Sequence, residues 1–132
     1  MAGGAKSSQS GRELAASVKA VAESLGLDVR SEVKVGRRLW GSVRRIDLVL
    51  SDPRTRRSLG IECKFQRTPG TAEEKTPATI QDIQAWPIDG LLVIDGPGFS
   101  ANMKGYLYST GKVVALEDLE GWLRLYFGLP GK

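Results

Sequence analysis

The sequence predicts an α/β domain whose elements follow the order αβββαβ and then add a helix, a strand and a last helix. Two features of its pattern predict this order. Apolar residues first recur at helical spacing and then alternate with polar residues, as they do in half-buried strands. Further along, the run LLVID is apolar without interruption, which is typical of a strand buried on both faces. We therefore expect a mixed central sheet flanked by helices.

The first helix is expected over 11–25, because apolar residues repeat there at helical spacing. Ser10 and Glu13 fit a capping box, with Ser10 as the N-cap and Glu13 three residues later. Gly26 suits the position that follows the last helical turn.

Three strands are expected next, over 27–35, 43–50 and 58–65, with a turn at 36–38 between the first two. Only a short connection joins the second strand to the third, so these two are expected to pair as a hairpin.

A second helix is expected to begin with Thr76 as its N-cap and Pro77 at its first position, and to end near Ala85. The buried strand LLVID follows it. The remaining elements are a short helix capped by Ser100, a strand over 112–116 and a helix over 117–127.

Length and composition limit the possible chemistry. The chain of 132 residues suffices for one core, so 11–132 is expected to form one domain after a flexible N-terminus at 1–10. No apolar run approaches the ~20 residues of a membrane helix and no secretory signal is visible, so we expect a cytoplasmic protein without a membrane partner. The sequence contains no histidine and one cysteine, Cys63. This excludes a Ser-His-Asp triad, histidine-ligated metals and a cysteine-based zinc site.

The candidate site comes from the second and third strands, IDLVL and LGIECKFQ. On the predicted hairpin, Asp47, Glu62 and Lys64 share one face. The opposite, core-facing side is expected to hold Ile46, Leu48, Leu50, Ile61, Cys63 and Phe65. The spacing alone also fits a solvated surface pair, which is common in half-exposed sheets.

Two carboxylates brought together repel each other, and a divalent cation removes that conflict. Mg²⁺ prefers oxygen ligands, commonly one or two carboxylates with waters and substrate phosphate. Asp47 and Glu62 supply such ligands, and the backbone carbonyl of Cys63 is a further one. Lys64 would then orient or deprotonate the attacking water and neutralise charge in the transition state.

This order of elements, with Asp47 on one strand and Glu62-Cys63-Lys64 on the next, resembles the PD-(D/E)XK nuclease superfamily over residues 11–95. That group includes many restriction endonucleases and archaeal-type Holliday junction resolvases. The resemblance implies a restriction-endonuclease-like fold, metal ligation by Asp47 and Glu62, and Lys64 as the catalytic lysine. It implies Mg²⁺ as the cofactor, with Mn²⁺ as a substitute.

Resolvase-like members carry a further acid on the first helix, and Glu13 matches that place, with Glu23 and Glu32 as lesser candidates. Glu13 has an alternative role as the capping-box partner alone. Some members also carry a glutamine two residues after the lysine, here Gln66, and then a Gly-Thr stretch ahead of an acid and a lysine, here GTAEEK ending at Lys75. The sequence departs from the family in having Ile46, not proline, before the first aspartate.

Between residues 30 and 67 the chain has eleven Lys or Arg and four acids, a balance of +7 within a whole-chain charge of +4. Such a basic block indicates a polyanionic partner, and the alternative is a solvated arginine-rich surface. With DNA as the partner, the expected contacts are Lys34, Arg37, Arg38, Arg44, Arg45, Gln66, Arg67, Lys75 and Gln81. Trp40 would stack on a base or, as we favour, pack under the loop.

The last helix has more apolar residues than one buried face needs, among them Leu125, which points to a homodimer interface. We thus expect a metal-dependent DNA endonuclease of resolvase-like, restriction-like or homing-like type. The first alternative is a non-catalytic nucleic-acid-binding module on the same fold. The second is a protein-interaction domain whose arginines only aid solubility.

Overall fold

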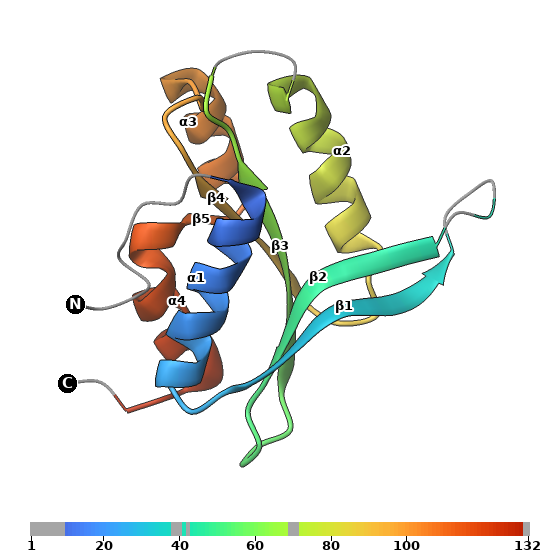
Figure 1. The fold of residues 1–132 in the computed structure, drawn as a ribbon, viewed down its shortest axis with the longest axis vertical. Coiled ribbons are helices and arrows are strands. Elements are labelled where there is room, and N and C mark those ends of the chain that lie inside the picture. The colour runs from blue at the N-terminus through green and yellow to red at the C-terminus, as the bar shows by residue number, and fades with distance from the viewer. Residues whose placement is uncertain (1–9, 38–40, 42, 69–71, 131–132) are drawn as a thin grey trace.

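The computed structural model describes residues 10–37, 41, 43–68 and 72–130, with the backbone alone for Arg37 and for 72–77. The elements are α1 (Gly11–Ser24), β1 (Asp28–Arg37), β2 (Val43–Ser51), β3 (Ser58–Phe65), α2 (Ala72–Gln84), β4 (Gly90–Asp95), α3 (Ala101–Ser109), β5 (Val113–Ala115), the 3₁₀ turn η3 (Leu116–Asp118) and α4 (Leu119–Phe127). The expected element order is confirmed (Figure 1).

The five strands form one sheet in the order β1-β2-β3-β4-β5. Strands β1, β2 and β3 pair antiparallel, whereas β3, β4 and β5 pair parallel, so the expected mixed sheet is confirmed. Five of the six residues of β4 are buried, as its unbroken apolar run predicts.

Helices cover both faces of this sheet, and each face has its own apolar cluster. The α1-side cluster joins α1 and α4 to the sheet and includes Leu14, Leu48, Leu50, Ile61, Cys63 and Leu123. The α2-side cluster joins α2 and α3 to the other face and includes Ile46, Val49, Ile80, Ile83, Leu92 and Ile94. Figure 1 shows α1 and α4 beside each other, with α2 apart from them.

Helix α1 begins as the sequence predicts. The Ser10 hydroxyl accepts a hydrogen bond from the Glu13 amide at 3.2 Å, and the buried residues of the helix are Leu14, Val18, Val21 and Ala22. The capping bond satisfies one of the amides that a helix start leaves without a partner.

Several predicted boundaries are wrong. The turn η3 occupies 116–118, where the end of a strand and the start of a helix were expected, and two further differences concern α2 and β1. Helix α2 begins at Ala72, not at Thr76, so Pro77 lies inside it. The preceding Ala-Glu-Glu-Lys segment explains the longer helix, because these are good helix formers and acids favour a helix start. Strand β1 continues through Gly36 and Arg37, where a turn was expected, with a register shift between Lys34 and Gly36. Arg38 and Trp40 lie outside the described residues.

Beyond the body of the sheet, β1 and β2 continue together as a two-stranded extension (Figure 1). We call it the arm, and define it as residues 33–37 of β1 and 43–46 of β2. In the part of the chain that the structure describes, no helix is long and apolar enough to cross a membrane.

Candidate active site

Strands β2 and β3 separate at the candidate site. Their pairing runs from Ser51↔Ser58 to Leu48↔Ile61 and ends there. Past that point β3 continues beside β4, while β2 continues beside β1 into the arm. Asp47 is the first residue of β2 beyond the last β2–β3 pair.

The Asp47 side chain takes over the hydrogen bond that the separated strand no longer makes. Gly60 and Gln66 donate their amides to carbonyls at Asp89 and Asp95, so the even-numbered amides of β3 point toward β4. The Cys63 amide therefore points toward β2, and it donates to Asp47 Oδ2 at 3.0 Å. Since the N–H and C=O of one residue in an extended strand point the same way, the Cys63 carbonyl lies on this edge as well.

Glu62 and Lys64 lie on the α2 side of the sheet. They align with Leu92 and Ile94 of the neighbouring parallel strand, and both of these belong to the α2-side cluster. Both side chains are partly buried. Cys63 points the other way, into the α1-side cluster, and is buried. The alternation expected for this strand is therefore confirmed.

The expected face of Ile46 is wrong. Ile46 packs in the α2-side cluster, whereas Leu48 and Leu50 pack on the α1 side. The side-chain alternation of both strands shifts phase between the pairs Ser31↔Leu48 and Val33↔Ile46.

Glu32 lies between those two pairs, opposite Asp47, and its φ of 51° is the physical reason for the shift. This left-handed conformation is rare for a residue other than glycine. Asp47 is thereby placed at the point where the arm changes direction.

Burial raises the pKa of the Asp47 carboxyl above its ordinary value of 3.8. The hydrogen bond from Cys63 and the charge of Lys64 act in the opposite direction, and the charge of Glu32 raises the pKa further. Lys64 and Glu32 are thus the charged groups that shift the pKa of Asp47. Sequence reasoning ranked Glu32 below Glu13, because the family resemblance places the further acid on the first helix, where Glu13 lies.

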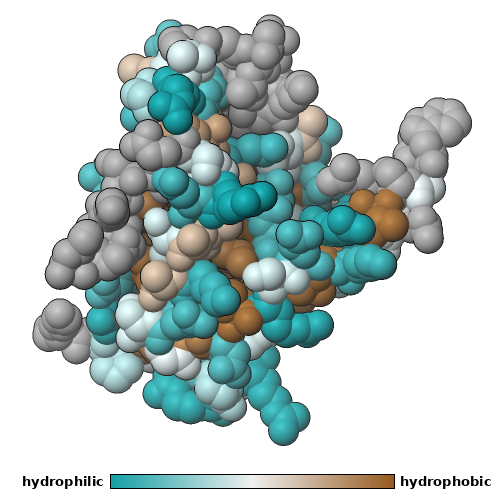
Figure 2. Space-filling view, in the orientation of Figure 1, coloured by the Kyte–Doolittle hydropathy of each residue, from teal (hydrophilic) through white to brown (hydrophobic). Residues whose placement is uncertain are grey.

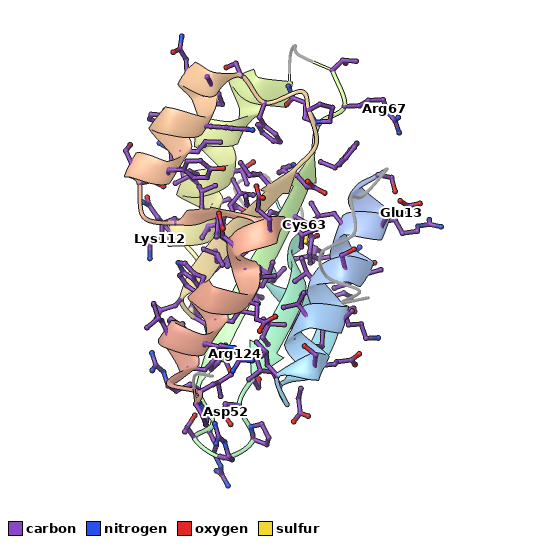
Figure 3. All side chains as sticks on the ribbon, turned by 90° about the vertical axis from the view of Figure 1, so that its left-hand side faces the viewer. Glu13, Asp52, Cys63, Arg67, Lys112 and Arg124 are labelled. Carbon is purple, nitrogen blue, oxygen red and sulfur yellow. The ribbon has the colours of Figure 1, made fainter. Side chains whose placement is uncertain are left out.

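The predicted metal ligands are not all brought together. Glu13 is exposed on α1, and Figure 3 shows its side chain turned away from Cys63. Burial raises the pKa of the Cys63 thiol, so the thiol stays protonated and is not a suitable metal ligand. The oxygen donor that Cys63 offers is its backbone carbonyl. Among the described residues, no three acidic or cysteine side chains are grouped closely enough to hold a metal ion. Metal ligation by Asp47, Glu62 and the Cys63 carbonyl therefore stays a prediction, in which all the donors are oxygens, as Mg²⁺ prefers.

Arg44, a predicted DNA contact, is used within the protein. Its Nε lies 3.1 Å from Asp82 Oδ1 of α2, and one terminal nitrogen donates to the Ala85 carbonyl at 3.4 Å. Both side chains of the ion pair are 21% exposed. Arg44 therefore links the arm to α2, and nothing in the sequence around Arg44 identifies Asp82 as its partner.

Gln66 is also held inside the protein. It is 5% exposed, and its side-chain amide donates to the Gly98 carbonyl at 3.0 Å. A Cβ on Gly98 would lie 2.7 Å from the Gln66 side chain, so only glycine permits this approach. A direct DNA contact by Gln66 is therefore not favoured.

The other predicted contacts differ in what the structure describes. Lys34, Arg45, Arg67 and Gln81 are exposed. Arg67 lies 5.8 Å from the Phe65 ring, and Figure 3 shows it at the opposite end of the molecule from Asp52. The side chains of Arg37 and Lys75, and all of Arg38, lie outside the described residues.

Most apolar residues of α4 belong to the core. Leu119, Leu123 and Phe127 are buried, and Trp122 and Tyr126 pack against the same cluster. Leu125 is 86% exposed. The homodimer expected through this helix stays a prediction, with a smaller apolar surface than its composition suggested.

A family profile described as "PD-(D/E)XK nuclease superfamily domain" matches residues 6–113. No curated protein matches the chain.

Two solved structures share the fold. The protein of unknown function AF1548 is 22% identical with a TM-score of 0.52, over 76% of this chain and 55% of that one. Protein VC1899 from Vibrio cholerae is 18% identical with a TM-score of 0.59, over 89% of this chain and 34% of that one. A chain of a DrdV–DNA complex matches at 19% identity and a TM-score of 0.42, over 67% of this chain and 9% of that one. The chain thus spans about half and about a third of the first two relatives.

Proposed function

Because the chain belongs to the PD-(D/E)XK nuclease superfamily, we propose that it is a metal-dependent endonuclease that hydrolyses phosphodiester bonds in DNA. The observation that carries this proposal is the position of Asp47 at the separation of β2 from β3, bonded to the Cys63 amide and within the electrostatic influence of Lys64. A surface acid without a function would not need this hydrogen bond to the neighbouring strand.

In this proposal Asp47, Glu62 and the Cys63 carbonyl hold Mg²⁺, with Mn²⁺ as a substitute. When bound, the ion lowers the pKa of a water molecule and stabilises charge on the phosphate. The partial burial of Asp47 supports this role, since a desolvated carboxylate gains more from a bound cation than an exposed one. Glu13 is left out of the proposed ligand set, because its side chain is exposed on α1.

Lys64 is proposed to orient the attacking water and to neutralise charge that develops on the phosphate. It lies two residues after Glu62 on the same face of β3, so one strand places the lysine beside a ligand. A lysine ammonium provides three donors and a compact positive charge, which suits a trigonal-bipyramidal phosphorus.

DNA-backbone contacts are proposed for the exposed cations near this site, Lys34, Arg45 and Arg67, with Gln81 as a neutral contact. Guanidinium and ammonium groups contact phosphates without reading sequence. The second candidate function is a non-catalytic DNA-binding module on the same fold, for which the basic balance of residues 30–67 alone would suffice.

The test is incubation with supercoiled, linear and branched DNA in the presence of Mg²⁺, Mn²⁺ or EDTA. The proposal expects metal-dependent cleavage of at least one of these substrates and none in EDTA. Salt-sensitive binding without cleavage under any condition would favour the binding module. Cleavage that persists in EDTA would contradict the metal-dependent reaction.

A further inference from the structure

We propose that the arm is a grip for duplex DNA, and that its contact surface is the face that presents Lys34 and Arg45. The inference rests on the proposed function for the identity of the polyanion as DNA. The arm itself is defined by the register of β1 and β2 and by what packs on each of its faces.

One face of the arm is fixed to the body of the protein. Val33, Val35 and Ile46 pack into the α2-side cluster. Arg44 adds the ion pair with Asp82 and the bond to the Ala85 carbonyl. These contacts set the direction of the arm relative to the sheet and leave its other face toward solvent.

The other face has a charge arrangement that folding does not explain. Lys34 and Arg45 are direct cross-strand partners. They alternate with the buried Ile46 and the partly buried Val33 and Val35, so they project to the opposite side. Both are exposed, and within the described part of the chain neither forms an ion pair. Like charges directly opposite each other destabilise a pair of strands. A bound polyanion would remove this repulsion.

The surroundings of this basic pair fit the same interpretation. From Val33 to Ile46 the sequence has five basic residues and no acid. Figure 2 shows hydrophilic residues along the arm on the face toward the viewer, with a small apolar patch next to its grey end. Arg45 precedes Asp47 by two residues, which is about 7 Å along a strand.

The geometry of the arm points to DNA in its B form. A two-stranded ribbon fits the major groove of B-DNA, whereas the major groove of an RNA duplex is too deep and narrow to admit side chains. Phosphate contacts by Lys34 and Arg45 would release counterions and make the affinity depend on salt.

The experiment measures binding of fluorescent duplex DNA by anisotropy in EDTA, so that no cleavage takes part. The variant is Lys34→Glu, which replaces a cation by an anion and at the same time gives Arg45 an opposite charge across the ladder. We expect the affinity to fall about tenfold or more while the melting temperature rises or stays equal. A loss of affinity through unfolding would instead lower the melting temperature.

The matched control is Arg56→Glu, the same change of charge at an exposed arginine in the β2–β3 turn, outside the arm. A variant with Lys34→Ala and Arg45→Ala should lower the salt slope of log K by roughly 1.8, about 0.9 per lost contact. The inference is overturned if Arg56→Glu weakens binding as much as Lys34→Glu, or if an RNA duplex of the same sequence binds as tightly.

The two proposals fail separately. If Lys34→Glu weakens binding but no condition gives cleavage, the endonuclease proposal fails and the proposal for the arm stands. If wild type cleaves DNA in a metal-dependent way and Lys34→Glu binds as tightly as wild type, only the proposal for the arm fails.

Discussion

Asp47 Oδ2 accepts a hydrogen bond from the Cys63 amide, with 3.0 Å between oxygen and nitrogen. This carboxylate oxygen takes the place of the backbone carbonyl that would come next in the ladder if β2 had remained beside β3. The carboxylate thus satisfies a strand that has lost its neighbour and leaves its second oxygen for other partners. The backbone of β3 thus holds the Asp47 side chain in place. Such preorganisation is what a site with a bound cation requires.

Glu62→Gln and Lys64→Ala are each expected to lower the cleavage rate by about 10²- to 10⁴-fold, the range usual for loss of a positioned acid–base group. Single-turnover cleavage with Mg²⁺ measures this, alongside binding in EDTA, which Glu62→Gln should leave within a fewfold of wild type. The matched controls are Glu117→Gln and Lys19→Ala, at exposed positions of η3 and α1. Equal rates for Lys64→Ala and Lys19→Ala would contradict the role of Lys64.

Asp47→Asn is expected to stabilise the protein in EDTA, increasingly as the pH rises. Burial raises the folded-state pKa of Asp47 above its ordinary value of 3.8. The ionised carboxylate therefore lowers the free energy of unfolding above the folded-state pKa. This destabilisation disappears below the unfolded-state pKa, where the carboxyl is protonated in both states.

Melting temperatures in EDTA between pH 4 and pH 8 check this pH dependence. The difference between Asp47→Asn and wild type should grow with pH, and a constant difference would contradict it. Added Mg²⁺ should raise the melting temperature of wild type and leave that of the variant unchanged.

The Arg44–Asp82 pair is expected to contribute about 1 kcal/mol of coupling, because both side chains are mostly buried and the contact joins the arm to α2. Urea denaturation of Arg44→Ala, Asp82→Ala and the double variant gives this value from a double-mutant cycle. Arg45→Ala serves as the control and should not lower the stability, because Arg45 is exposed. Strictly additive effects at Arg44 and Asp82 would show that the pair is not coupled.

Gly90→Ala is expected to destabilise the protein by about 1–3 kcal/mol, since its Cβ would overlap Ile83 and lie 2.7 Å from the Trp86 ring. Gly105→Ala should do the opposite and add about 0.5–1 kcal/mol, because Gly105 lies inside α3 with open space around its Cα. Urea unfolding compares the two variants. A stable Gly90→Ala variant would mean that Trp86 moves away from the sheet at little cost.

Cys63 should not react with a thiol reagent in the native protein and should react fully in denaturant. The side chain is 9% exposed and burial raises the thiol pKa, so little thiolate is present or accessible. The rate of labelling by Ellman's reagent measures this. Fast labelling under native conditions would reveal local opening of β3 at the candidate site.

Some elements were predictable from local pattern alone. The strand over 58–65 has its expected bounds, because its alternation is regular and it ends where polar residues begin. Helix α1 follows from its cap and its apolar spacing. These elements depend on neighbours in the sequence, which a single chain displays.

Other features depend on contacts between distant segments. Ile46 was expected on the wrong face, because the phase shift at Glu32 leaves no trace in the alternation. The partners of Arg44 and Gln66 come from α2 and from the turn after β4. Both residues are polar and look available for a ligand until tertiary packing assigns them a partner.

Strand β2 serves two different parts of the molecule along its length. From Leu48 to Ser51 it is a central strand with neighbours on both sides, and from Val43 to Ile46 it pairs with β1 alone. Asp47 is the residue between these two parts. A paired insertion or deletion of residues farther out would therefore lengthen or shorten the reach of the protein without shifting Asp47 against Cys63. Related chains can thus differ in the ligand that the arm contacts, while the position of Asp47 beside Cys63 stays the same.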